Sequence, residues 1–288
     1  AIVRASALER LARHGRFDPG LAGRAARDPE PLVRLVAARL ADALPLAARP
    51  AALGPLLSDA RRAIRIEAAR ALAGSQASLT ADLQPAWQRA ADEYAATLRH
   101  NADRPEANVA LGGFEAGLGR QREALDAFVR AMRLDPAFVP AYVNAADALR
   151  AVGSDAEAVA TLERGLARVP DSAALHHSLG LARVRMGETD SAMRSLKRAT
   201  ELEPDSARYT YVYAVALHST GRVADAVKLL EQALARWPND HDMLLALASF
   251  HMQAGRFDAT RDVVRRFIAA YPADPDAQEL AAQVGIAR

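Results

Sequence analysis

The stretch VPAYVNAADALRAVGSDAEAVATLERGLARVPDS, residues 139–172, decides the fold of this 288-residue chain. It contains two segments with helical apolar periodicity, separated at Gly153 and closed by Pro170. This pattern is typical of two antiparallel helices joined by a short turn. Five consecutive stretches share it: 105–138, 139–172, 173–206, 207–240 and 241–274. The sequence therefore predicts an all-α chain, an α-solenoid of stacked helix pairs.

Four columns of residues recur every 34 positions in these repeats. Glycine ends each first helix, at Gly119, Gly153, Gly187, Gly221 and Gly255. Proline follows each second helix, at Pro136, Pro170, Pro204, Pro238 and Pro272. A small residue lies in each first helix, at Gly112, Ala146, Gly180, Ala214 and Ala248, and in each second helix, at Ala124, Ala158, Ala192, Ala226 and Thr260. Left-handed glycine closes a helix, proline stops one, and small residues let two helices cross closely.

The segments that flank the five repeats are also predicted to be helical. Residues 275–288 begin with Pro275 after the helix-capping Asp274, and we expect a capping helix there. Residues 80–104 contain one apolar-periodic segment, from Pro85 to about His100, which we expect to connect two arrays. Ser172, Ser206 and Asp240 are predicted N-caps of the repeat helices.

Residues 1–79 repeat with a shorter period. Similar helices are expected at Val3-Arg4, Val33-Arg34 and Ile64-Arg65. Asp28 precedes Arg34 by six residues, and Asp59 precedes Arg65 by six. This resembles HEAT-like repeats, and the resemblance implies that these aspartates and arginines pair along a ladder.

The composition narrows the possible chemistry. The chain has no cysteine, which excludes disulfides, thiolate metal sites and covalent haem attachment within it. Its net charge is +2, yet residues 1–79 carry thirteen arginines against seven acidic residues. These arginines favour a structural role, and binding of an anionic polymer is a weaker alternative. No aromatic residues alternate with them to stack on bases, which argues against a nucleic-acid partner.

No catalytic, metal-binding or phosphate-binding motif appears in the sequence. The seven histidines form no helix-spaced metal pair, and the glycines follow the 34-residue period rather than a phosphate-cradling loop. No apolar run is long enough for a membrane helix. We therefore expect no enzyme activity, no metal, no cofactor and no membrane insertion.

The small residues and the prolines of residues 105–274 lie at the signature positions of the tetratricopeptide repeat, which this region resembles. The resemblance implies a concave groove, lined by positions 2, 5, 9 and 12 of the first helices, that binds a protein or peptide. The candidate groove residues are Val143, Asn144, Asp147, Arg150, His177, Leu181, Val184, Tyr211, Val215, His218, Leu245, Ser249 and Met252. Among these, Tyr211, His177 and His218 are candidate anchors. Packing between neighbouring repeats is the alternative role for Leu181 and Val184.

The order of the two kinds of repeat along the chain gives a second resemblance. Phrases such as NADRPEA at 101–107 and ARYTYVYAVALHSTGR at 207–222 are similar to the C-terminal region of bacterial multihaem cytochrome-like proteins. That resemblance implies an exported, periplasmic protein with haem-binding motifs upstream of Ala1. The preferred function is thus a protein-binding scaffold, and the alternative is a docking domain of an exported redox protein.

Overall fold

The computed structural model describes residues 1–286, and all secondary structure in this range is helical. The C-terminal helices are α7 (Pro105–Gly117), α8 (Gln121–Leu134), α9 (Val139–Ala151), α10 (Asp155–Leu166), α11 (Ala173–Arg185), α12 (Thr189–Leu202), α13 (Ala207–Ser219), α14 (Val223–Arg236), α15 (His241–Gln253), α16 (Phe257–Ala270) and α17 (Pro275–Gln283). The first helices α7, α9, α11, α13, α15 and α17 begin exactly 34 residues apart. The all-α solenoid prediction is confirmed.

The local signals act as the sequence predicts. The five glycines that end first helices have φ between 70° and 81°, the left-handed region. The side chains of Ser172, Ser206, Asp240 and Asp274 each accept a hydrogen bond from the amide three residues later. The small residues of the second helices are fully buried. These features fix the start, end and crossing of each helix pair.

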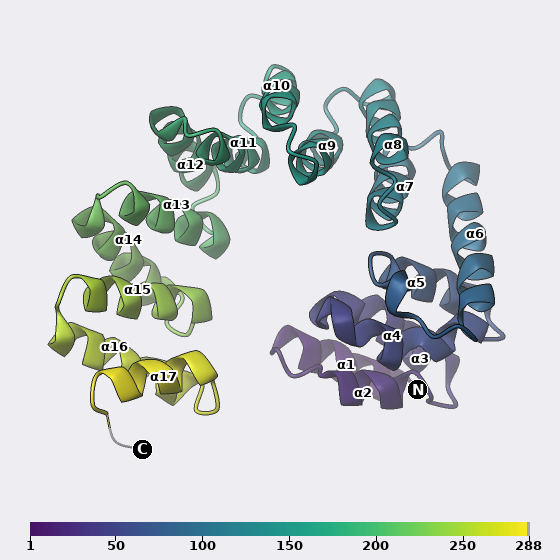
Figure 1. Cartoon of the computed structure of the whole chain (residues 1–288), viewed down its shortest axis with the longest axis horizontal. Helices are drawn as coiled ribbons and strands as arrows, with labels where there is room; N and C mark the ends of the chain where they lie inside the picture. Colours follow the sequence, from purple (N-terminus) through teal and green to yellow (C-terminus); the bar gives the residue numbers. More distant parts are fainter. Residues whose placement is uncertain (287–288) are drawn as a thin grey trace. The chain divides into compact units, whose positions relative to one another are not determined.

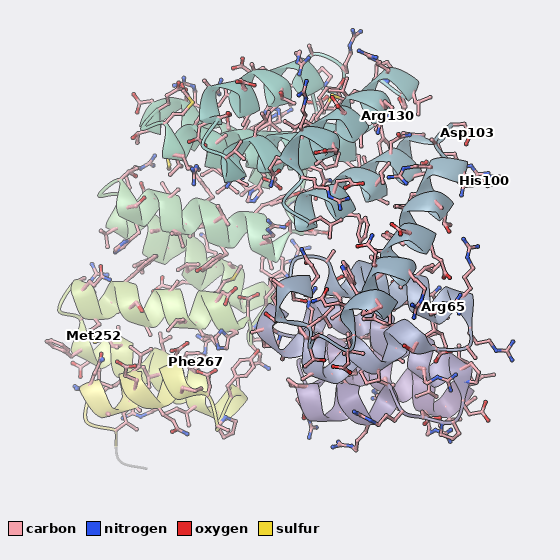
Figure 2. All side chains as sticks on the ribbon, turned by 45° about the vertical axis from the view of Figure 1, so that its right-hand side comes forward. Arg65, His100, Asp103, Arg130, Met252 and Phe267 are labelled. Atoms are coloured by element: carbon pink, nitrogen blue, oxygen red, sulfur yellow. The ribbon has the colours of Figure 1, made fainter. Side chains whose placement is uncertain are left out.

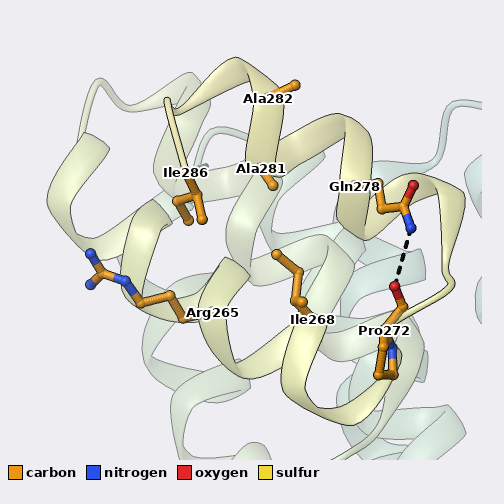
Figure 3. Close-up of a pocket in the computed structure, with 7 residues that line it drawn as sticks. All are labelled: Arg265, Ile268, Pro272, Gln278, Ala281, Ala282 and Ile286. Carbon is orange, nitrogen blue, oxygen red and sulfur yellow. Dashed lines mark hydrogen bonds between the residues drawn. The ribbon is translucent and has the colours of Figure 1, made fainter. Parts of the chain in front are cut away.

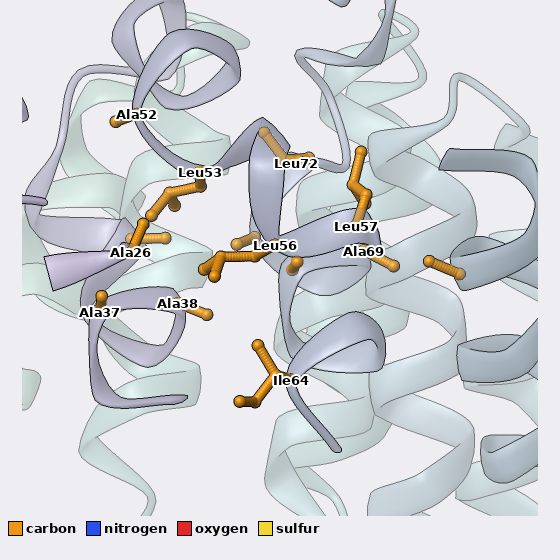
Figure 4. Close-up of a cluster of buried hydrophobic side chains, with 14 of the residues drawn as sticks. Ala26, Ala37, Ala38, Ala52, Leu53, Leu56, Leu57, Ile64, Ala69 and Leu72 are labelled. Carbon is orange, nitrogen blue, oxygen red and sulfur yellow. The ribbon is translucent and has the colours of Figure 1, made fainter. Parts of the chain in front are cut away.

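The N-terminal region consists of shorter helices. They are α1 (Ile2–Arg13), α2 (Pro19–Ala25), α3 (Pro31–Arg39), α4 (Arg49–Leu53), α5 (Arg62–Leu72) and α6 (Gln84–His100), with four short 3-10 helices, η1 (Leu40–Ala43), η2 (Leu46–Ala48), η3 (Gly54–Ser58) and η4 (Gln76–Ser78). Leu53, Leu56, Ile64 and Leu72 converge in their core (Figure 4). Burying several such aliphatic side chains, at about 2 kcal/mol each, holds these short helices together.

Arginines and carboxylates form a ladder along this region. Arg4 pairs with Asp28 at 2.9 Å, Arg34 with Asp59 at 2.6 Å, and Arg65 with Glu93 at 2.8 Å. Arg65, labelled in Figure 2, also donates to the backbone carbonyl of Asp59. Arg49 and Arg70 pair with Asp42 as well. Five of the thirteen arginines of residues 1–79 therefore hold neighbouring turns together.

By internal packing the chain divides into two compact units, unit 1 (residues 1–148) and unit 2 (residues 149–288, described to 286). Unit 1 includes the N-terminal helices, α6, the first repeat and most of α9. One buried cluster continues from Ala5 to Ala127, so the core is not interrupted near residues 80–104. There the ring of Phe114 contacts those of Trp87 and Tyr94.

Unit 2 contains α10 to α17, which stack in chain order (Figure 1). Its core is a second buried cluster, from Ala214 to Ala281, built from α13 to α17. Among the described residues, no helix has the length and apolar character that crossing a membrane requires.

Candidate functional site

In the C-terminal part of unit 2, the first helices α13, α15 and α17 form the inner row. α13 contacts α15, and α15 contacts α17, whereas contacts between α12 and α14 or between α14 and α16 are sparser. When successive helices in one row approach each other more closely than those in the other row, the stack curves toward that row. We call the surface of α13, α15 and α17 that faces this side the first-helix face.

The predicted residues of α13 and α15 lie together on this face. Tyr211, Leu245 and Met252 are half-buried and pack against the same cluster (Met252 is labelled in Figure 2). Val215 is 37% exposed, and Ser249 is half-buried with its hydroxyl donating to the Leu245 carbonyl. The His218 ring stacks on Phe250 of α15 with centroids 3.7 Å apart, which fixes its position. The structure thus brings these six predicted residues together on α13 and α15.

A hollow of about 280 Å³ lies between α15 and α17, and we call it the α15–α17 notch. Its lining residues are Leu245, Ser249, Met252, Gln253, Asp276, Glu279, Leu280 and Gln283. Three of these, Leu245, Ser249 and Met252, were candidates from sequence. Asp276, Glu279 and Gln283 were missed, although they lie 34 residues after Asp242, Leu245 and Ser249. Treating 275–288 as a sixth first helix rather than only as a cap would have found them.

The candidates on α9 and α11 are distributed differently. Val143, Asn144 and Asp147 belong to unit 1, whereas Arg150 belongs to unit 2. The Asn144 amide donates to the Pro140 carbonyl at 2.8 Å, so one of its donors is occupied within α9. On α11, Leu181 is half-buried and Val184 is 51% exposed. Packing against the next repeat therefore does not cover Val184.

His177 differs from its expected place. The side chain does not project into the groove. The residue is 3% exposed, and its ring centroid lies 4.6 Å from that of Tyr209. Neither ring nitrogen has a hydrogen-bond partner among the described residues. Burial, with smaller contributions from the positive charges of Arg208 and Arg150, lowers the pKa of His177 to about 4. His177 is therefore a buried neutral ring and not an anchor exposed to a partner.

Acidification should destabilise the protein through His177. The pKa of His177 is about 4 in the folded chain against 6.5 for a free histidine, so the unfolded state takes up the proton first as pH falls. The free energy of unfolding should therefore fall between pH 6.5 and about 4, by about 1–2 kcal/mol after screening. His177→Phe should remove this loss. Denaturant titrations at several pH values measure the free energy of unfolding of wild type and of His177→Phe.

The control for this experiment is His14→Gln, which changes an exposed histidine and should leave the pH profile unaltered. If His177→Phe and wild type lose the same stability over this pH window, the buried neutral ring is not the cause.

Another histidine ties α15 to α17. His241 Nε2 lies 2.9 Å from Asp274, the N-cap of α17, and its Nδ1 lies 3.3 Å from Asp242. Burial alone would lower the pKa of His241, but the hydrogen bonds with Asp274 and Asp242 raise it on balance. His241, Asp274 and Asp276 offer ligand atoms within 4.8 Å of one another, which makes them a possible metal-ligand group. The hydrogen bond between His241 and Asp274 joins the first residue of α15 to the N-cap of α17.

A second hollow, of about 490 Å³, lies on the other side of α17, against α16 (Figure 3). Ile268, Ala281 and Ile286 give it apolar walls, and Arg265 lies at its edge. Gln278 donates across it to the Pro272 carbonyl at 3.1 Å. No carboxylate is among its lining residues within the described chain. The two sides of α17 therefore differ in charge.

Comparison with known families agrees with this architecture. A family model described as a tetratricopeptide repeat matches residues 177–241, and a second model with the same description matches 115–183 and 217–284. Residues 115–284 are tetratricopeptide repeats. The sequence matches no curated protein. The family match confirms the repeat prediction over this region, and tetratricopeptide repeats are in general protein-interaction modules.

Several solved structures share the tetratricopeptide fold. The chain is similar to PilW, described as a widely conserved type IV pilus biogenesis factor, with 18% identity over 67% of this chain and 90% of that one (TM-score 0.57). It is similar to PilF of Pseudomonas aeruginosa, with 17% identity over 65% and 84% (TM-score 0.54). A tetratricopeptide repeat protein of Parabacteroides merdae matches with 14% identity over 69% and 80% (TM-score 0.54). At these identities the likeness shows the fold alone.

Proposed function

We propose that this tetratricopeptide-repeat chain is a non-catalytic scaffold that binds a peptide or protein segment along the first-helix face of unit 2. One observation carries the proposal. On α13 and α15, Tyr211, Leu245 and Met252 are half-buried on this face, and Leu245 and Met252 also line the α15–α17 notch. A partly exposed tyrosine and flexible aliphatic side chains around a hollow form a surface suited to peptide capture.

The side chains on this face offer contacts rather than chemistry. The rings of His218 and Phe250 are locked by stacking, and the His177 ring is buried. No nucleophile–base pair lies on the face among the described residues. Its apolar groups can bury surface on a partner, while the exposed carboxylates of α17 can set its orientation.

Substitutions on the first-helix face should weaken binding of a selected peptide. A displayed library of random 12-residue peptides, panned on the whole chain, would supply the probe. Tyr211→Ala and Met252→Ala should each raise the Kd of that peptide roughly tenfold, because each removes buried contact area. Fluorescence anisotropy measures the Kd, and the thermal midpoint checks the fold.

The control is Phe257→Ala, which truncates an exposed apolar residue at the start of the second helix α16. It should leave the Kd unchanged. Equal effects of Phe257→Ala and Tyr211→Ala, or no effect of either face substitution, would sink the proposal.

The HEAT-like character of residues 1–79, the multihaem resemblance and the exported location stay predictions from sequence. A C-x-x-C-H motif in a natural sequence preceding Ala1 would support the docking-domain alternative. A complete natural sequence that lacks this motif would contradict it.

A further inference from the structure

The α15–α17 notch has a composition unlike the rest of the first-helix face. Leu245, Met252 and Leu280 form its apolar part, and the exposed Asp276 and Glu279 contribute two carboxylates. No lysine, arginine or histidine is among the lining residues of the described chain. The notch therefore combines an apolar floor with a rim of two carboxylates.

The two carboxylates are not consumed by internal ion pairs. Within residues 1–286 neither has a cationic partner within 4.0 Å, and Glu279 accepts a hydrogen bond from the Gln283 amide at 3.2 Å. His241 has a ligand atom within 4.8 Å of one of Asp276, but its ring nitrogens hydrogen-bond with Asp274 and Asp242. Asp276 lies in the first turn of α17, where the helix dipole stabilises its charge without neutralising it, since the dipole contributes only a partial charge.

The size of the notch limits what it can hold. Its volume of about 280 Å³ lies at the lower edge of the range typical of small-molecule sites. It suits one or two side chains of a peptide better than a cofactor. A long cationic side chain fits this chemistry, because its methylene stem packs on apolar surface while its charged head reaches toward acceptors.

We propose that the α15–α17 notch binds an arginine or lysine of the partner peptide, with an aliphatic residue beside it. The stem and the neighbouring aliphatic residue pack on Leu245, Met252 and Leu280, and the cationic head meets Asp276 and Glu279. This inference rests on the proposed function, since it names the side chains that the first-helix face selects. It also orients the partner, whose basic residue lies over α17.

The opposite side of α17 explains why this notch, rather than the larger hollow, selects a cation. The hollow against α16 has Arg265 at its edge and no lining carboxylate, so a basic side chain would meet a like charge there. Charge complementarity therefore favours a basic partner residue in the notch and disfavours one in the hollow against α16.

The test uses peptides selected on the whole chain by display of a random 12-residue library. Selected sequences should be enriched in arginine or lysine next to leucine, isoleucine, valine or methionine. The double variant Asp276→Asn/Glu279→Gln should weaken binding of a selected basic peptide roughly tenfold. Replacing the basic residue of the peptide by glutamine should weaken binding to wild type to a similar degree, and to the double variant hardly further.

A matched control removes two acidic charges elsewhere. Asp258→Asn/Asp262→Asn changes two exposed aspartates on α16 and should leave the Kd unchanged, which separates local recognition from net charge. Rising salt should weaken binding to wild type more than to the Asp276→Asn/Glu279→Gln variant.

The outcomes distinguish this inference from the function on which it rests. If selected peptides lack basic residues, or if Asp276→Asn/Glu279→Gln binds them as well as wild type while Tyr211→Ala does not, the notch assignment is overturned and the scaffold proposal stands. If no peptide is selected, or if Tyr211→Ala also has no effect, both proposals fail.

Discussion

Asp59→Ala should lower the free energy of unfolding by roughly 2–3 kcal/mol, because it leaves the Arg34 guanidinium without its carboxylate in the interior of the N-terminal array. The side chain of Asp59 is only 6% exposed and that of Arg34 17%. Asp59 also accepts a hydrogen bond from the Arg61 amide at 2.8 Å, which the substitution removes. Urea denaturation measures the loss.

The neighbouring rung of the ladder provides the control. Arg4, the partner of Asp28, is 54% exposed, so water can solvate it when the carboxylate is removed. Asp28→Ala should therefore cost much less than Asp59→Ala. Equal losses at the two positions would show that burial of the arginine does not decide the energetics of the ladder.

The stabilisation by the Arg34–Asp59 pair also depends on pH. Burial by itself would raise the pKa of Asp59, but the hydrogen bonds from Arg34 and from the Arg61 amide lower it on balance below the usual 3.8. The pair therefore stabilises the fold above that pKa and loses its contribution as pH falls through the lowered value. The Asp59→Ala variant and wild type should converge in stability at the acid end.

Gly112→Ala should destabilise the protein, whereas Gly113→Ala, in the same helix, should stabilise it. A Cβ at Gly112 would lie 2.7 Å from Cδ1 and 2.8 Å from Cζ of Phe128, whose ring is buried and cannot move aside. A Cβ at Gly113 would meet nothing within 4 Å. Overpacking should cost Gly112→Ala a net 1–2 kcal/mol or so, while Gly113→Ala should gain about 1 kcal/mol in helix propensity.

Chemical denaturation of the two variants tests this pair directly, since helix propensity changes equally in both. Gly180→Ala offers a second instance, because a Cβ there would lie 2.6 Å from Cγ of Leu196. If Gly112→Ala and Gly113→Ala are equally stabilised, the small-residue column does not mark the helix crossing.

Most of the fold can be predicted from the sequence because its signals are local and repeat. Gly153 and Ser172 act within a few residues of their own position, and every repeat contains the same signals 34 residues on. The helix of residues 84–100 was expected from Pro85 to about His100 for the same reason. The division into compact units after Ala148 could not be predicted, because the residues on both sides of it follow the same 34-residue period.

The candidate site was only partly predictable, since exposure depends on the neighbouring repeat. His177 and Tyr211 occupy the same column, yet the ring of Tyr209 in the next repeat covers His177. The period gives the position of a residue but not the size of the side chain that lies beside it. Asp276 and Glu279 line the notch because α17 packs on α15 as another first helix, which an interpretation of residues 275–288 as a cap alone does not predict.

The most direct test of the central claim is to map a bound peptide on the isotopically labelled whole chain by NMR. The peptide is one selected by display, added until the chain is saturated. We expect amide and methyl shifts to change at Tyr211, Leu245, Met252 and the first turns of α17. Changes confined to the second helices α12, α14 and α16, or to residues 1–79, would contradict it.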